Sequence, residues 1–208
     1  VAGRLPLSNG YETMQFLAWC IMLFAYIFRK RSLIIVPAGF LLSGFTLLVS
    51  YLGQMDPAIT PLMPVLLSPW LSLHVSVIMM SYALFSFIFV IGIVALILHG
   101  KRSENISEQI GRLMIMSRLL LFPALLLLGT GIFIGAIWAN LSWGRYWGWD
   151  PKEVWALITF MVYSAALHNN SVPAFRKPKF FNWYLVLAFV TVIMTYFGVN
   201  WLGGMHSY

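Results

Sequence analysis

The sequence has very few charged residues. Asp, Glu, Lys and Arg make up 9% of its 208 residues, whereas hydrophobic residues make up 61%. A soluble domain of this size could not bury so much apolar surface. The composition therefore excludes an ordinary soluble enzyme and predicts an integral membrane protein.

Acidic residues and cysteine are scarcer still. Cys20 is the only cysteine and lies in an apolar run, so an internal disulfide is excluded and a buried, inert thiol is expected. The 13 basic residues outnumber the 6 acidic ones, but they are dispersed at the ends of apolar runs. That distribution is typical of membrane topology, and we expect lipid rather than nucleic acid around the chain. Because the sequence opens on Val1 and not on Met, we expect it to be part of a longer polypeptide.

Six apolar runs predict transmembrane helices, each of which needs about 20 residues. The runs cover residues 12–28, 33–52, 74–98, 113–139, 151–167 and 181–202. A proline-rich loop, residues 53–73, separates the second from the third, and a polar segment, residues 99–112, separates the third from the fourth. The expected fold is all-α, a polytopic membrane bundle of about six helices that forms one transmembrane domain over residues 1–208.

The basic residues predict the orientation of this bundle. One set of helix ends carries most of them: Arg29, Lys30, Arg31, Lys101, Arg102, Arg112, Arg176, Lys177 and Lys179, with Arg118 just inside. The other set carries only Arg4, Arg145 and Lys152. By the positive-inside rule the first set is cytoplasmic. Both termini are then expected to face outward.

A tryptophan segment, residues 143–155 (WGRYWGWDPKEVW), is the most distinctive part of the chain. It holds four tryptophans and a tyrosine, with Gly144 and Gly148 between them. Indole rings spaced by glycine can form a broad apolar surface for a flat hydrophobic ligand. An aromatic belt at the membrane–water interface would account for part of the same pattern. Both interpretations place the segment at the outer membrane surface.

The same segment contains a helix start. Asp150 can cap the next helix, Pro151 suits its first position, and Glu153 falls where a capping box needs an acid. Asp150 therefore has two compatible interpretations, a helix cap and a direct contact to a ligand.

The predicted topology sorts the four histidines into two pairs. His74 and His206 lie at outer helix ends, on the side of the tryptophan segment, and His99 and His168 lie at inner ends. Two imidazoles beside an apolar aromatic surface are a plausible pair of axial haem ligands. The alternative is that each is an ordinary interfacial histidine.

The string WGRYWGWDPKEVWALITF resembles the tryptophan-rich WWD signature of haem-handling membrane proteins of cytochrome c biogenesis. The resemblance is greatest to the CcsA (ResC) type, including the CcsA-like half of fused CcsBA cytochrome c synthases. The stretches GRLPLSNGYETMQFLAW and YFGVNWLGGMHSY, near the two ends, support it. It implies an outward WWD loop at about residues 140–153. It also implies the bacterial inner membrane with a periplasmic active face, or the thylakoid membrane in a plastid.

The resemblance further implies a function and its residues. The protein would transport haem b and, with a CcsB/ResB-type partner, fused or separate, act as a cytochrome c synthase (haem lyase) on the Cys-x-x-Cys-His segment of apocytochrome c. By position, His74 and His206 match the outer ligands of haem iron. His168 matches an inner ligand whose mate lies on the CcsB part. The expected haem contacts in the loop are Trp143, Gly144, Arg145, Tyr146, Trp147, Gly148, Trp149 and Asp150. Arg145 and Lys152 either pair with haem propionates or are solvated.

Two other functions remain compatible with the sequence. One is a dihaem b-type electron carrier that uses His74 with His206 and His99 with His168. Its weakness is that these histidines lie at helix ends, and His99, directly before Gly-Lys-Arg, is better explained as a plain interfacial residue. The other is a small-molecule transporter with an aromatic gate, which leaves the histidines unexplained.

Overall fold

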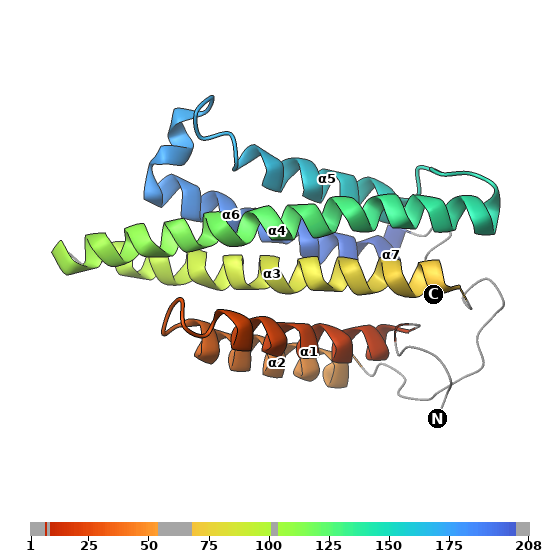
Figure 1. Ribbon diagram of the computed structural model, residues 1–208, viewed down its shortest axis with the longest axis horizontal. Helices are drawn as coiled ribbons and strands as arrows, with labels where there is room; N and C mark the ends of the chain where they lie inside the picture. The colour runs from red at the N-terminus through yellow and green to blue at the C-terminus, as the bar shows by residue number, and fades with distance from the viewer. Residues whose placement is uncertain (1–6, 8, 54–67, 101–103, 203–208) are drawn as a thin grey trace. The chain divides into compact units, whose positions relative to one another are not determined.

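A computed structural model describes Leu7 and residues 9–53, 68–100 and 104–202, and every regular element in these ranges is helical (Figure 1). The long helices are α1 (Gly10–Phe28), α2 (Ile35–Leu52), α3 (Pro69–His99), α4 (Glu104–Trp143), α5 (Pro151–Ala165) and α6 (Pro178–Ile193). Shorter elements are the 3₁₀ turn η2 (Pro173–Arg176), the π-helical turn η3 (Met194–Gly198) and α7 (Val199–Leu202). The predicted all-α class is confirmed.

Within the described residues, five stretches are long and apolar enough to cross a membrane: Gly10–Phe28, Ile35–Leu52, Pro69–His99, Asn105–Trp143 and Pro178–Gly198. The predicted span at residues 151–167 forms α5, which has 15 residues. At ~1.5 Å per residue α5 is ~22 Å long, shorter than the hydrocarbon core of a typical bilayer. The protein is therefore a multi-pass helical membrane protein in which α5 is the shortest of the long helices.

Two helices begin earlier than the hydropathy pattern predicted. Residues 69–73 were expected in a loop but form the first turn of α3, because proline is well tolerated at a first helical position. Residues 104–112 were expected to be a polar connection but belong to α4. There Arg112 and Glu108, four residues apart, form an ion pair of 3.1 Å that suits a solvated helical turn. The remaining predicted loop residues, 54–67, lie outside the described residues.

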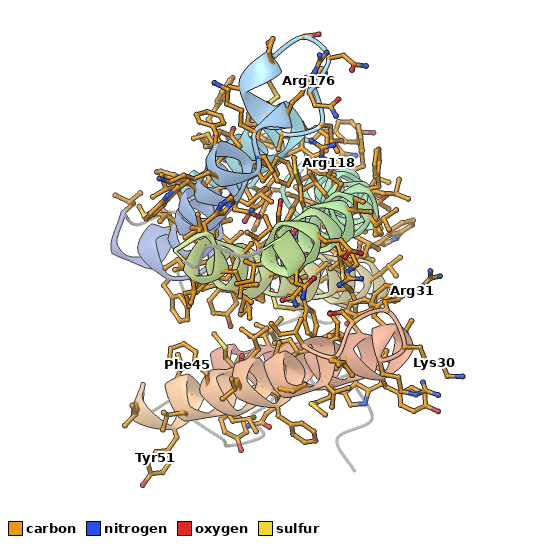
Figure 2. The ribbon with its side chains drawn as sticks, turned by 90° about the vertical axis from the view of Figure 1, so that its left-hand side faces the viewer. Lys30, Arg31, Phe45, Tyr51, Arg118 and Arg176 are labelled. Atoms are coloured by element: carbon orange, nitrogen blue, oxygen red, sulfur yellow. The ribbon has the colours of Figure 1, made fainter. Side chains whose placement is uncertain are left out.

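The chain divides into two compact units. Unit 1 comprises residues up to Ala83 together with Leu127–Trp149, and unit 2 comprises Leu84–Leu126 together with residues from Asp150 onward. In unit 1, α1 and α2 pack as an antiparallel hairpin, and the Asn9 side chain caps α1 by accepting from the Glu12 amide over 2.8 Å. Cys20 is fully buried there, as predicted. Lys30 and Arg31 project from the turn between the two helices (Figure 2).

Unit 2 packs the second half of α3, the first half of α4, α5 and α6 around aromatic pairs. The rings of Phe85 and Tyr163 stack with centroids 4.0 Å apart, and those of Phe89 and Phe189 with centroids 4.5 Å apart. Tyr184 of α6 donates its hydroxyl to the carbonyl oxygen of Val162 on α5 over 2.7 Å. These contacts fix how α3, α5 and α6 are aligned along their axes within the unit.

Candidate functional site

The irregular part of the tryptophan segment is the loop of residues 144–150, between α4 and α5. It is shorter than the predicted loop at 140–153, because residues 140–143 complete α4 and residues 151–153 begin α5. Gly144 ends α4: its φ is +73° and its N–H donates to the carbonyl oxygen of Asn140 over 2.9 Å. Glycine suits this position because a left-handed residue after a helix is strained with any Cβ present.

Trp143 is the last residue of α4 and packs inward. Its ring meets that of Trp138 edge to face, with centroids 4.8 Å apart. Trp138 is 2% exposed and Trp143 is partly buried. Sequence reasoning missed Trp138, which lies five residues before the segment on the same helix. The pair gives Trp143 a packing role in the end of α4.

Trp147 and Trp149 form a second edge-to-face pair, with centroids 6.0 Å apart and planes at 89°. Trp149 is 76% exposed and Tyr146 is 62% exposed. Trp149 also has a φ of +57°, a left-handed conformation that is strained for a side chain of this size. A large ring thus lies exposed on a strained backbone, an arrangement that suits contact with a ligand or partner.

Arg145 lies over the backbone of Gly148. A Cβ added at Gly148 would stand 3.2 Å from Nε of Arg145 and 3.3 Å from its Cζ. Gly148 therefore lets the guanidinium approach the backbone closely, while Arg145 remains exposed at the loop surface. A cation at this place can pair with a carboxylate brought to the loop.

Asp150 begins α5 with the predicted capping box. Its Oδ1 accepts from the Lys152 amide over 3.0 Å, and its own N–H donates to Oε2 of Glu153 over 3.1 Å. Asp150 is 6% exposed. The cap is confirmed, and a direct contact of Asp150 with a ligand stays a prediction.

His74 lies in the second turn of α3 and packs on α4 within unit 1. Its Nδ1 is 2.7 Å from the carbonyl oxygen of Gly131. Because a carbonyl oxygen only accepts, Nδ1 carries the proton, and the lone pair of the neutral ring is on Nε2. Histidine ligands of metals are commonly oriented by such a bond from the second ring nitrogen.

Gly135 of α4 makes room for this imidazole, and Gly131 makes room for the neighbouring Ile78. A Cβ at Gly135 would stand 2.7 Å from both Cε1 and Nδ1 of His74, and one at Gly131 would stand 2.5 Å from Cδ1 of Ile78. Glycines four residues apart, as in Gly131-x-x-x-Gly135, let α4 approach α3 closely within unit 1. Gly135 thus forms a seat for His74, about 12 Å along α4 from Trp143 at ~1.5 Å per residue.

The other histidines differ in their surroundings. His206 lies outside the described residues. His168, just after α5, is exposed and donates from Nδ1 to the carbonyl oxygen of Ser164 over 2.9 Å. His99 ends α3; its Nε2 is buried and has no hydrogen-bond partner among the described residues. Its environment is less solvated than its place before Gly-Lys-Arg predicted.

A family model described as cytochrome c assembly protein matches residues 7–206, a range that includes His74, the loop and His168. The chain belongs to the cytochrome c assembly protein family. It is 42% identical over 216 residues to protein NrfI of Wolinella succinogenes, and 36% identical over 226 residues to cytochrome c biogenesis protein CcsA of Chlamydomonas reinhardtii. It is also 35% identical over 241 residues to CcsA of Guillardia theta.

Each of these alignments covers the whole of this chain. They differ in the share of the relative's own length that is covered. The chain spans 24% of the W. succinogenes protein, 62% of the C. reinhardtii protein and 77% of the G. theta protein. The resemblance to CcsA that was drawn from the tryptophan segment is confirmed. Within the described parts of the chain, no group of three or more His, Cys, Asp or Glu side chains is arranged to hold a metal ion.

Proposed function

We propose that this chain handles haem in cytochrome c assembly. It binds haem b on the outward side of the membrane, at the loop of residues 144–150, with His74 and His206 as axial ligands of the iron. There it presents the haem to apocytochrome c. The family assignment supports a role in cytochrome c assembly, and the CcsA-type relatives support the membrane setting.

The observation that carries this proposal is the hydrogen bond from Nδ1 of His74 to the carbonyl oxygen of Gly131. Iron is bound by an imidazole nitrogen that carries a lone pair, and this bond puts the lone pair on Nε2. The glycine seat holds the ring in one orientation, so little rotational freedom would be lost on ligation. His74 therefore has the tautomer and the support that an axial ligand needs.

The loop offers the other groups that a haem would contact. The exposed rings of Trp149 and Tyr146 are flat and apolar, as the macrocycle face is, and the guanidinium of Arg145 can pair with a propionate. Trp143 packs on Trp138 at the end of α4, directly before the loop. Gly144, Trp147, Gly148 and Asp150 complete the predicted contact set.

The chemistry that follows is thioether formation on the apocytochrome segment Cys-x-x-Cys-His. Each cysteine sulfur bonds to one carbon of a vinyl group and a hydrogen goes to the other carbon, so the addition is redox-neutral. The contribution of this chain is to orient the haem and to occupy both axial positions of the iron, which hinders reaction with O₂. A CcsB/ResB-type partner, fused or separate, completes the synthase (haem lyase).

His168 serves an inner site that receives haem before it reaches the outer one, with the second axial ligand supplied by the CcsB-type partner. The side chain is exposed at the end of α5, where a partner can reach it. Its Nδ1 donates to the Ser164 carbonyl, which again leaves the lone pair on Nε2. By the distribution of Lys and Arg, this end is cytoplasmic and the outer site faces the periplasm or the thylakoid lumen.

The test is the absorption spectrum of the chain purified with its partner. We expect low-spin haem b with two histidine ligands. His74→Gly should lower haem content and cytochrome maturation, and added imidazole should restore both in part. Wild-type spectrum, haem content and maturation in His74→Gly and in His206→Gly would refute the outer site. Haem reduction by quinol without thioether formation would instead favour the dihaem electron carrier.

A further inference from the structure

Arg118 is a cation placed among the helices of unit 2. It lies in α4, and its Nη2 donates to the carbonyl oxygen of Phe175 over 2.9 Å. Its Cζ stands 5.0 Å from the centroid of the Phe181 ring on α6. Figure 2 looks along the helices and shows Arg118 among them, with Arg176 on the connection between α5 and α6. Arg118 is thus held by α6 and by the turn that precedes it.

The charge of Arg118 has no counter-charge in the described part of the chain. No carboxylate there lies within ion-pair distance of its guanidinium, and its Nε is buried without a hydrogen-bond partner. A carbonyl and an aromatic face compensate a guanidinium only in part. An ionisable residue in this position within a membrane bundle is costly to keep and commonly marks a binding site or pathway.

Two buried polar residues are sequence neighbours of Arg118 and of the Phe181 ring that it contacts. Ser117 precedes it in α4, and Asn182 follows Phe181 in α6; both residues are 0% exposed. Within the described residues, Oγ of Ser117 and Oδ1 of Asn182 have no hydrogen-bond partner. The orientation of the amide is fixed, because Nδ2 of Asn182 donates to the Pro178 carbonyl over 2.9 Å. Oγ of Ser117, Oδ1 of Asn182 and Nε of Arg118 thus all have hydrogen-bonding capacity that the described residues of unit 2 do not use.

The turn that Arg118 holds belongs to the connection that begins at His168. The Val172 amide donates to the His168 carbonyl over 2.8 Å, and the Phe175 amide donates to the Val172 carbonyl over 3.1 Å. The Phe175 carbonyl then accepts from Arg118. A continuous set of short bonds thus joins the guanidinium to the backbone of the proposed inner haem ligand.

We propose that Arg118 binds a carboxylate of the ligand held at the inner site, with Ser117 and Asn182 as polar neighbours. This inference rests on the proposed function, in which that ligand is haem and the carboxylate is a propionate. Arginine suits the role because its planar fork donates two parallel bonds to a carboxylate. Arg118 selects for the charged edge of the haem, a task that His168 as an iron ligand cannot perform.

The experiment compares haem with its dimethyl ester, which keeps the iron and the macrocycle but has no free carboxylate. The full protein with its partner is purified with His74→Gly, so that the haem measured is that of the inner site. We expect this protein to bind haem about tenfold more tightly than the ester, as the loss of one charged hydrogen-bonded pair implies. Arg118→Gln should remove the difference by weakening haem alone, and Arg118→Lys should retain part of it.

Arg176→Gln is the matched control. Arg176 donates from Nε and Nη2 to the carbonyl oxygens of Asn169 and Asn170 (3.0 and 3.4 Å), so it holds the same connection from an exposed position. We expect it to keep the preference for haem over the ester. If Arg118→Gln weakens haem and ester equally, Arg118 only holds the turn and the inference is wrong.

An anionic lipid headgroup is the other source of a counter-charge. In nanodiscs of phosphatidylcholine, adding phosphatidylglycerol should leave the preference for haem over the ester unchanged. A preference that disappears with phosphatidylglycerol would assign Arg118 to lipid and overturn the inference. Binding of haem with no preference in any variant refutes this inference alone, whereas absence of haem from the wild-type complex refutes the proposed function as well.

Discussion

Trp138 and Trp143 meet edge to face with ring centroids 4.8 Å apart, so one of the segment's four tryptophans is a packing residue of α4. Trp149, by contrast, is 76% exposed at a strained φ. The tryptophans that look equivalent in the sequence therefore divide into supporting and exposed rings.

We predict opposite effects of removing these two kinds of ring. Trp138→Ala should destabilise the protein by about 3–5 kcal/mol, because it leaves a cavity at a fully packed site. Trp149→Ala should leave the amount of protein in the membrane unchanged and lower its haem content. Membrane yield by immunoblot and haem per protein by pyridine haemochrome measure the two effects. Equal loss of protein in both variants would indicate that Trp149 is part of a structural belt.

The seat of His74 can be tested without changing the histidine. In Gly135→Ala the new Cβ would stand 2.7 Å from Cε1 and Nδ1 of His74, so the ring has to move from the Gly131 carbonyl. We expect the affinity of the outer site for haem to fall about 10- to 100-fold, as when a metal-bound histidine loses its orienting partner. Gly111→Ala, also in α4, is the control because nothing lies within 4 Å of its Cβ. If both variants retain haem equally, the seat has no role in ligation.

The two interpretations of Asp150, a helix cap and a contact to the ligand, can be distinguished with a neutral residue that still caps the helix. Asp150→Asn keeps an N-cap side chain, whereas Asp150→Ala loses it and should cost about 1 kcal/mol in stability. If Asp150 is only a cap, the asparagine variant keeps both its thermal midpoint and its haem content. A loss of haem in Asp150→Asn at an unchanged midpoint would show that the carboxylate contacts the ligand.

The inner histidines are distinguished by paired substitutions. His168→Ala should reduce haem at the inner and the outer site, because the outer site is filled through the inner one, and imidazole should rescue it in part. His99→Ala should have little effect on haem content. We expect it to change the stability of the protein, because Nε2 of His99 is buried. Each variant is measured with the full partner. Severe loss in His99→Ala and none in His168→Ala would reverse the assignment and favour the dihaem carrier.

Much of the fold could be predicted from hydropathy, since apolar runs of membrane length have few alternative structures. The helix start at residue 104 could not, because the polar first turns of α4 carry no hydropathy signal. The start at residue 69 could not, because Pro69 continues a proline-rich sequence. The cap at Asp150 was predictable because its determinants are local in sequence. Arg118 was missed as a participant because its role depends on a contact with another element, the turn at Phe175. Trp138 was missed because it lies before the tryptophan segment, although its partner Trp143 is on the same helix.

The bond between His74 and Gly131 has a consequence for how this chain can vary. An orienting carboxylate on a side chain can be lost by a single codon change, but a main-chain carbonyl is present whatever residue occupies position 131. The bond from Nδ1 is therefore independent of the side-chain chemistry at position 131, and a larger residue at Gly135 would displace the ring by steric contact. Substitutions beside this histidine are therefore limited by side-chain size. Which ring nitrogen carries the proton is set by the backbone of α4.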